Sequence, residues 1–279
     1  MLLAVLLGSG SALAAQSTLT IDADAAIMTI FVKPDKVTAF DQILETLKAA
    51  LQRSKNPLRN AQAAGWQVFK TEEQVQGNIT YVMRLDPVVR NIDYDITRIF
   101  SEELPGEAVE LSRVYREAQV ARALTTMTRI TVPGLGEPSP AQALPVTAPA
   151  IVPVLSFETA QAVVMTVLIR PEREAAFEMT LAQLGKALQA STTPGRKRQA
   201  AGWKVYRGMQ PFNGNIAYVV SLDPVVHRAE YDPMRLIQET YPDSVDALFQ
   251  KYREAYVGQA ISRLTNRIEM GHRFTPIRH

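Results

Sequence analysis

The chain has no cysteine and only three histidines among its 279 residues. The missing cysteine excludes disulfide bonds, thiolate nucleophiles and cysteine-ligated metals. His272 and His279 stand at the C-terminal end, and His227 is the third histidine. The sequence also lacks a phosphate-binding glycine loop, a nucleophile elbow and the usual metal-binding patterns. We therefore expect no metal and no cofactor, and we assign no residue to catalysis.

An excess of charge and a long apolar run are also missing. The 30 basic and 28 acidic residues leave a formal net charge of +2, which does not favour nucleic acid as a partner. No run of 18 apolar residues occurs, so we expect no membrane-spanning helix. With 47% hydrophobic and 21% charged residues, the composition is that of a chain with a packed core.

The first fifteen residues differ from the rest. A short apolar run, Leu2 to Leu7, is followed by Ala12-Leu13-Ala14, the small-x-small pattern of a signal-peptidase site. No lysine or arginine precedes the run, and a buried N-terminal strand is the alternative. We expect residues 1–15 to be a signal peptide and the protein to be exported, either periplasmic or secreted.

The chain repeats itself at an offset of 137 residues (165 − 28). Met28-Thr29 recurs as Met165-Thr166, and Gly65-Trp66 recurs as Gly202-Trp203. The same offset relates the Leu-Asp-Pro-Val-Val segments at 85–89 and 222–226. A period of this length makes each copy a whole domain and not a solenoid unit.

We expect the domains to span 24–132 and 159–270, with a C-terminal tail at 271–279. Between them, residues 133–158 are rich in proline and alanine. Proline lacks a backbone N–H and favours an extended chain, so this stretch reads as a linker.

Each copy predicts the same order of elements. Apolar, β-rich runs at 26–32 and 163–169 end before prolines, and amphipathic helices follow them. Alternating strands are expected at 66–70 and 79–85, and at 203–207 and 216–222. A short helix, a longer helix over 107–123 or 244–260, and a last weak strand complete each copy. The order is β-α-β-β-α-β, the ferredoxin-like arrangement of an α+β fold.

This order resembles the dimeric α/β-barrel superfamily, the fold of antibiotic-biosynthesis monooxygenase-like domains. The chain is also similar to exported bacterial proteins of unknown function that carry an Ala-Ala-Gly-Trp segment and an Asp-Pro-Val-Val segment, here Ala63 to Trp66 and Asp86 to Val89. The resemblance implies that the two repeats pair as an intramolecular pseudo-dimer. Haem-binding barrel relatives generally use an axial histidine, and no histidine recurs in both copies, so haem is not implied.

Aromatic side chains on the strands are our candidates for a ligand site. If the barrel encloses a pocket, the inner sheet faces form its wall, and a small apolar or aromatic ligand is the expected partner. The alternative is that these side chains are simply core, as is usual for an aromatic on an alternating strand. The six predicted ligand-binding residues are Trp66, Tyr81, Tyr94, Trp203, Tyr218 and Tyr231.

For the charged residues we expect structural roles and not ligand binding. Asp86 and Asp223 precede prolines and favour a turn over a carboxylate at the barrel mouth. Asp95 and Asp232 are expected as helix N-caps. The basic residues before each Gly-Trp favour a solvated helix end over an anion site. They are Arg53, Lys55 and Arg59 in the first copy and Arg196, Lys197 and Arg198 in the second. His227 is expected at the surface.

Three functions remain open, in order of preference. The first is a non-catalytic binding or interaction module, which the missing cysteine and histidine favour. The second is a cofactor-free monooxygenase-like enzyme that acts on an activated aromatic substrate, and it rests on the fold resemblance alone. The third is a structural envelope protein without a ligand.

Overall fold

The computed structural model describes residues 18–136, 153–193 and 195–271, and the expected signal peptide lies outside them. The first half consists of β1 (Ala25–Val32), a 3-10 turn η1 (Pro34–Lys36), α1 (Val37–Arg53), α2 (Pro57–Ala64), β2 (Trp66–Val75), β3 (Asn78–Leu85), α3 (Ile96–Glu103), α4 (Ala108–Ala118) and β4 (Gln119–Ile130). The second half consists of β5 (Ala162–Ile169), η2 (Pro171–Arg173), α5 (Glu174–Ala190), α6 (Arg196–Ala201), β6 (Trp203–Gly208), β7 (Ile216–Leu222), α7 (Pro233–Thr240), η3 (Pro242–Ser244), α8 (Val245–Ala255) and β8 (Tyr256–Glu269).

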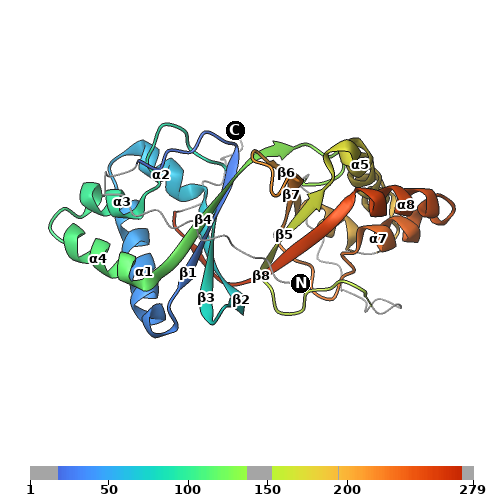
Figure 1. Cartoon of the computed structure of the whole chain (residues 1–279). Coiled ribbons are helices and arrows are strands. Elements are labelled where there is room, and N and C mark those ends of the chain that lie inside the picture. Colours follow the sequence, from blue (N-terminus) through green and yellow to red (C-terminus); the bar gives the residue numbers. More distant parts are fainter. Residues whose placement is uncertain (1–17, 137–152, 194, 272–279) are drawn as a thin grey trace, which may run out of the picture.

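The eight strands form one closed barrel in the order β1-β3-β2-β8-β5-β7-β6-β4, with all neighbours antiparallel. Each half contributes four adjacent strands, and the halves join at two seams, β2 with β8 and β4 with β6. The helices lie on the outer sides of the two sheets (Figure 1). The prediction of an α+β fold is confirmed, and the fold contains an eight-stranded barrel.

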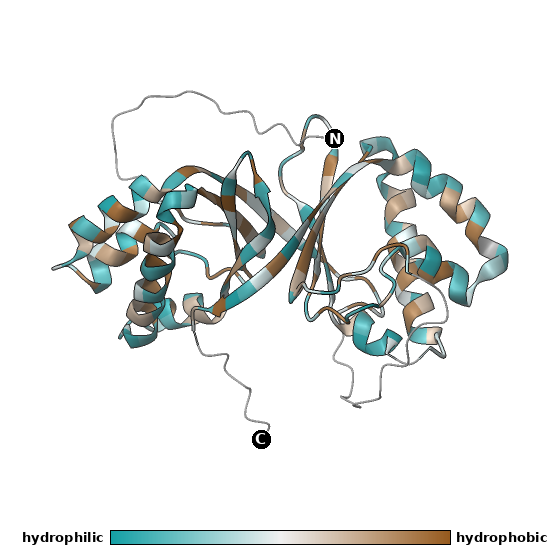
Figure 2. Ribbon diagram, turned by 90° about the horizontal axis from the view of Figure 1, so that it is seen from below, coloured by the Kyte–Doolittle hydropathy of each residue, from teal (hydrophilic) through white to brown (hydrophobic). Residues whose placement is uncertain are grey.

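Apolar residues fill three separate cores. One lies between the first-half strands and α1, α3 and α4, and a second lies between the second-half strands and their helices. A smaller third core fills the barrel interior, with Ile27, Phe69, Val82, Val164 and Tyr206 among its members. Successive residues of a strand point to opposite faces, so each strand serves a helix-side core and the barrel core in turn. In Figure 2 the helices alternate between hydrophilic and hydrophobic colours, as expected for elements that cover a sheet on one side.

The repeated glycine before each tryptophan is explained by a close backbone contact. A Cβ atom on Gly65 would lie 2.4 Å from the carbonyl oxygen of Pro87, and one on Gly202 would lie 2.5 Å from that of Pro224. The Asp86–Pro87 and Asp223–Pro224 peptide bonds are both cis. The backbone N–H of Asp86 donates to Gly65 O at 2.8 Å, which ties the strand end to the turn.

The boundaries of the last helix and strand differ from the prediction. The helices expected over 107–123 and 244–260 end at Ala118 and Ala255, where β4 and β8 begin at once. These strands are 12 and 14 residues long, since each pairs first with its own half and then with the other. The pairing partner decides the conformation here, and local sequence does not reveal it.

Both described ends of the predicted linker pack on the second half. Leu135 is 8% exposed and Phe157 is 1% exposed, and both belong to the second-half core. The backbone N–H of Tyr231 donates to Leu155 O at 2.7 Å. Residues 137–152 lie outside the described residues.

The two seams are not equivalent. The β4–β6 pairing runs without interruption, whereas the β2–β8 register shifts between Val68 and Lys70. At the shift, Asn266 in β8 has a positive φ of 49°. A β-bulge of this kind re-aims neighbouring side chains and separates the two strands locally. No described helix is both long enough and apolar enough to span a membrane.

Candidate functional site

The six predicted aromatic residues do not lie between the sheets. Trp66, Tyr81 and Tyr94 belong to the first helix-side core, and Trp203, Tyr218 and Tyr231 to the second. The sequence pattern showed which residues share a face but not which face meets the helices. The expected wall of a pocket inside the barrel is therefore formed by other residues, while ligand binding by these six stays a prediction.

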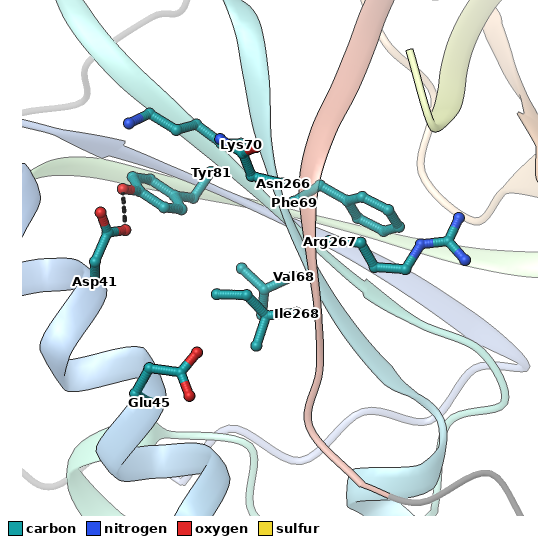
Figure 3. A pocket seen from close by; sticks show the side chains of 9 residues that line it. All are labelled: Asp41, Glu45, Val68, Phe69, Lys70, Tyr81, Asn266, Arg267 and Ile268. Carbon is teal, nitrogen blue, oxygen red and sulfur yellow. Dashed lines mark hydrogen bonds between the residues drawn. The ribbon is translucent and has the colours of Figure 1, made fainter. Parts of the chain in front are cut away.

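Tyr81 does line a cavity, although on the helix side of the sheet. The cavity has a volume of about 320 Å³ and lies between α1 and the β2–β8 seam (Figure 3). Its lining residues are Asp41, Glu45, Val68, Phe69, Lys70, Tyr81, Asn266, Arg267 and Ile268. We call it the α1 pocket. Glu45 and Asn266 are exposed, so the pocket meets solvent beside them.

Three polar side chains of the α1 pocket contact one another. The Tyr81 hydroxyl donates to Asp41 Oδ1 at 2.5 Å, and the Lys70 ammonium lies 5.8 Å from the centre of the Tyr81 ring. Burial, reinforced by the adjacent carboxylate of Asp41, raises the pKa of Tyr81. Tyr81 therefore stays protonated at neutral pH and acts as a hydrogen-bond donor, not as a base.

The α1 helix places two carboxylates on the same side of the pocket. Asp41 and Glu45 are four residues apart, which puts them one above the other on a helix face. The apolar wall opposite consists of Val68 and Ile268, which point toward the helix in Figure 3. The combination of an apolar wall with a few convergent polar groups is typical of small-molecule sites.

A second polar group of residues joins the two halves beside this pocket. Asp86, after β3, accepts hydrogen bonds from Lys204 Nζ at 2.6 Å and from the Tyr206 hydroxyl at 2.7 Å. Asp223, its counterpart after β7, forms ion pairs with Arg84 and Arg267. We call these six residues the inter-half cluster.

The inter-half cluster includes a contact between equivalent positions of the two halves. Arg84 Nη1 donates to Ser221 Oγ at 2.9 Å, and these two residues occupy equivalent positions in the halves. The guanidinium groups of Arg84 and Arg267 both lie near the Phe69 ring, at 5.5 and 5.1 Å from its centre. Stacking on an aromatic face and pairing with carboxylates are what an arginine side chain does best in a buried site.

The charges of the cluster hold both aspartates ionised. Burial alone would raise the pKa of Asp86, but Lys204, Tyr206 and Arg84 together hold it below its usual value. Burial acts in the same direction on Asp223, and Arg84 and Arg267 outweigh it, so its pKa is lowered as well. The favoured interpretation of these aspartates as simple turn residues is thus incomplete. Asp86 binds residues of the second half, and Asp223 binds one arginine from each half.

Other charged residues follow the prediction in part. Asp95 and Asp232 cap α3 and α7 as expected, and His227 is exposed. Arg59 and Arg196 contradict the expected solvated helix end. Both are buried, and each pairs with a glutamate of the following helix, Glu102 or Glu239.

Asp41, Lys70 and Arg84 could not be singled out from the sequence, because only the fold brings them near Tyr81 and Asp223. The equivalent positions of the second copy carry different residues, such as Glu178 in place of Asp41 and Ser221 in place of Arg84. A difference between the copies was the one signal available for them. Among the described residues, no group of three or more His, Asp or Glu side chains is placed to hold a metal ion.

Comparisons with known proteins give a likeness of fold. No protein-family model and no curated protein matches the chain. Among solved structures, a proposed monooxygenase of Fusobacterium nucleatum is 11% identical, with a TM-score of 0.45, and covers 88% of this chain and 94% of its own. An anthrone oxidase-like protein is 13% identical, with a TM-score of 0.37 and coverage of 91% and 97%. Chlorite dismutase of Candidatus Nitrospira defluvii is 9% identical, with a TM-score of 0.38 and coverage of 88% and 92%.

These similarities agree with the predicted resemblance to the dimeric α/β-barrel superfamily. They also overturn the preferred function. The non-catalytic binding or interaction module is contradicted by neighbours that bear the names of enzymes, and we do not propose it again. At such identities and TM-scores the activities of these proteins do not pass to this chain. Its chemistry has to be argued from its own pocket.

Proposed function

We propose that the chain is a monooxygenase-like barrel enzyme that oxidises an activated aromatic substrate in the α1 pocket. The observation that carries the proposal is the pocket itself, in which a protonated tyrosine and two helix carboxylates face an apolar wall within about 320 Å³. This space fits a substrate of one or two aromatic rings, since ligand pockets begin at roughly 300 Å³.

The polar residues have separate roles in this proposal. Asp41 or Glu45 accepts a proton from the acidic O–H or C–H group of a quinol-type substrate. Lys70 and Arg267 place positive charge near the pocket and favour the substrate anion that results. Tyr81 fixes Asp41 through its hydrogen bond and so holds the carboxylate in place.

The overall reaction balances without a further electron donor. The substrate SH₂ and O₂ give SO and H₂O: one oxygen atom forms a bond to the substrate, the O–O bond breaks, and the second oxygen leaves as water with the two substrate hydrogens. The substrate anion supplies the electrons. The residues of the pocket bind the substrate and take its proton.

Oxygen uptake by the purified protein tests the proposal. We expect uptake with at least one member of a panel of quinols, phenols and anthrone. Asp41→Asn should lower kcat by roughly 100-fold, the usual contribution of a positioned acid–base group. Tyr81→Phe should lower kcat by a smaller factor, because it removes the hydrogen bond that holds Asp41 in place. Tyr218→Phe is the matched control, because Tyr218 is the counterpart of Tyr81 in the second half and pairs with Glu174 and Glu178 outside the α1 pocket. No uptake above the protein-free blank with any of these compounds would remove the proposal.

The repeated offset and the strand order support a finer view of the architecture. In this view each half is a ferredoxin-like domain, and the two form an intramolecular pseudo-dimer through the β2–β8 and β4–β6 seams. A linker raises the effective concentration of one domain at the other to about millimolar, which favours pairing within the chain. Export remains part of the proposal, on the strength of the N-terminal sequence alone.

A further inference from the structure

The second half contains a smaller counterpart of the α1 pocket. It has a volume of about 160 Å³, and Val205, Ile130 and Arg129 are among its lining residues. Val205 is the repeat equivalent of Val68 in the α1 pocket. Ile130 and Arg129 correspond to Ile268 and Arg267 once the bulge at Asn266 is counted.

Two hydrogen bonds support this alignment of β4 with β8. Arg129 N donates to Asp24 Oδ2 at 3.1 Å, and Arg267 N donates to Gln161 Oε1 at 3.0 Å. Asp24 and Gln161 are themselves equivalent under the repeat. The two cavities therefore share part of their walls, and their different sizes require an explanation.

A segment of the chain forms one wall of the second-half cavity. After β4 the backbone continues as Pro133–Gly136, and Leu135 of this segment lines the cavity and is only 8% exposed. The segment is held at several points: Gln189 Nε2 donates to Gly134 O at 2.9 Å, and Gly136 N donates to Ala200 O at 2.9 Å. We call it the plug segment.

The helix beneath the plug segment is shaped to accept it. A Cβ atom on Gly185 of α5 would lie 2.1 Å from Pro133 O and 3.6 Å from the Leu135 side chain. The equivalent residue in α1 is Lys48, which carries a long side chain where Gly185 has none. Gly134 has a φ of +84°, a conformation that other residues rarely adopt. The second half is thus adapted to the plug, and the first half is not.

We propose that the second half holds a closed second site for the same class of ligand, a small aromatic molecule, and that the plug segment is its built-in occupant. Among the described residues, the α1 pocket is lined only by α1, β2, β3 and β8, and no segment of this kind crosses it. The ligand class rests on the proposed function, whereas the closure of the second site does not.

Labelling of single cysteines tests the closure, because the natural chain contains none. Val68→Cys and Val205→Cys place a thiol at equivalent positions in the two cavities, and both valines are buried, at 0% and 2% exposure. With benzyl methanethiosulfonate as the aromatic probe, we expect Val68→Cys to react about tenfold faster or more, since a closed site is reached only through local opening. Equal rates would overturn the proposal.

Release of the plug should open the second site selectively. Adding Leu135→Gly to Val205→Cys is expected to raise its labelling rate toward that of Val68→Cys, while the same change added to Val68→Cys should leave that rate unaltered. Gln189→Ala removes the bond to Gly134 O without touching the core and should raise the Val205→Cys rate by a smaller factor. If circular dichroism shows that Leu135→Gly unfolds the protein, Gln189→Ala decides the question.

An unchanged Val205→Cys rate in the folded variants would show that the plug does not close the site. The labelling rates need no enzymatic activity. Failure of the closure proposal is therefore distinguishable from absence of oxygen uptake, which bears only on the proposed reaction.

Discussion

Asp223 illustrates how a single carboxylate can couple the two halves. Its side chain is 10% exposed and pairs with Arg84 from the first half and Arg267 from β8. Removal of one partner from a buried ion pair leaves an uncompensated charge, which usually costs about 3 kcal/mol or more. The residue was visible in the sequence as part of a repeated Asp-Pro, but its partners were not, because they lie 139 and 44 positions away.

The lowered pKa of Asp223 predicts a pH dependence of stability. Its folded pKa lies below the value of about 3.9 for an aspartate in an unfolded chain, so its contribution is complete above that pH and is lost as the pH falls through the folded pKa. Asp223→Asn should lower the free energy of unfolding at pH 6 by about 3 kcal/mol. On further acidification, the free energy of unfolding of this variant should fall less than that of the natural protein.

Denaturant unfolding at pH 6, 4 and 3 measures this effect. Asp35→Asn is the control, since Asp35 is exposed in η1 and should behave as the natural protein does. A constant difference between Asp223→Asn and the natural protein across the three pH values would contradict the assignment.

Tyr81 shows the limit of residue-level prediction at the site. It was selected as one of six aromatics, on the assumption that they face the other sheet, and it lines a cavity on the opposite side. Alternation along a strand groups Tyr81 with Met83 and Leu85 on one face. It cannot say whether helices or the second sheet cover that face, because both coverings are apolar.

At the scale of elements, the repeated Gly-Trp and Asp-Pro segments act as one unit. Gly65 ends α2 against the cis Asp86–Pro87 turn, and Trp66 then begins β2. These positions and most strands followed from the sequence, because turn chemistry and alternation are local. The end of α4 did not, since pairing of β4 with β1 and β6 overrides the helical pattern after Ala118.

The close contact at Gly65 predicts a sharp difference between glycines. Gly65→Ala would force its Cβ against Pro87 O and should destabilise the protein by about 2 kcal/mol, the usual cost of overpacking. Gly106→Ala is the matched control, because a Cβ there meets no atom within 4 Å. The midpoints of thermal unfolding compare the two variants, and a Gly65→Ala midpoint equal to that of Gly106→Ala would argue against a tight contact.

At the scale of the whole molecule, one chain forms a closed barrel from two halves of four strands each. Both seams lie between the halves, and the α1 pocket takes residues from α1 and β2 of one half and β8 of the other. The segments that recur at an offset of 137 residues predicted two copies of one unit. Closure of the barrel was expected only from the resemblance, because sequence alone does not say whether two similar sheets meet within or between chains.

The most direct test is a disulfide across the β4–β6 seam. Thr128 and Arg207 are paired neighbours there, from different halves. Upon oxidation at low protein concentration, the Thr128→Cys, Arg207→Cys double variant should form an internal disulfide and migrate as a single chain on a non-reducing gel, while Thr128→Cys alone gives no such bond. A covalent dimer as the main product, or no disulfide at all, would contradict the claim that one chain closes its own barrel.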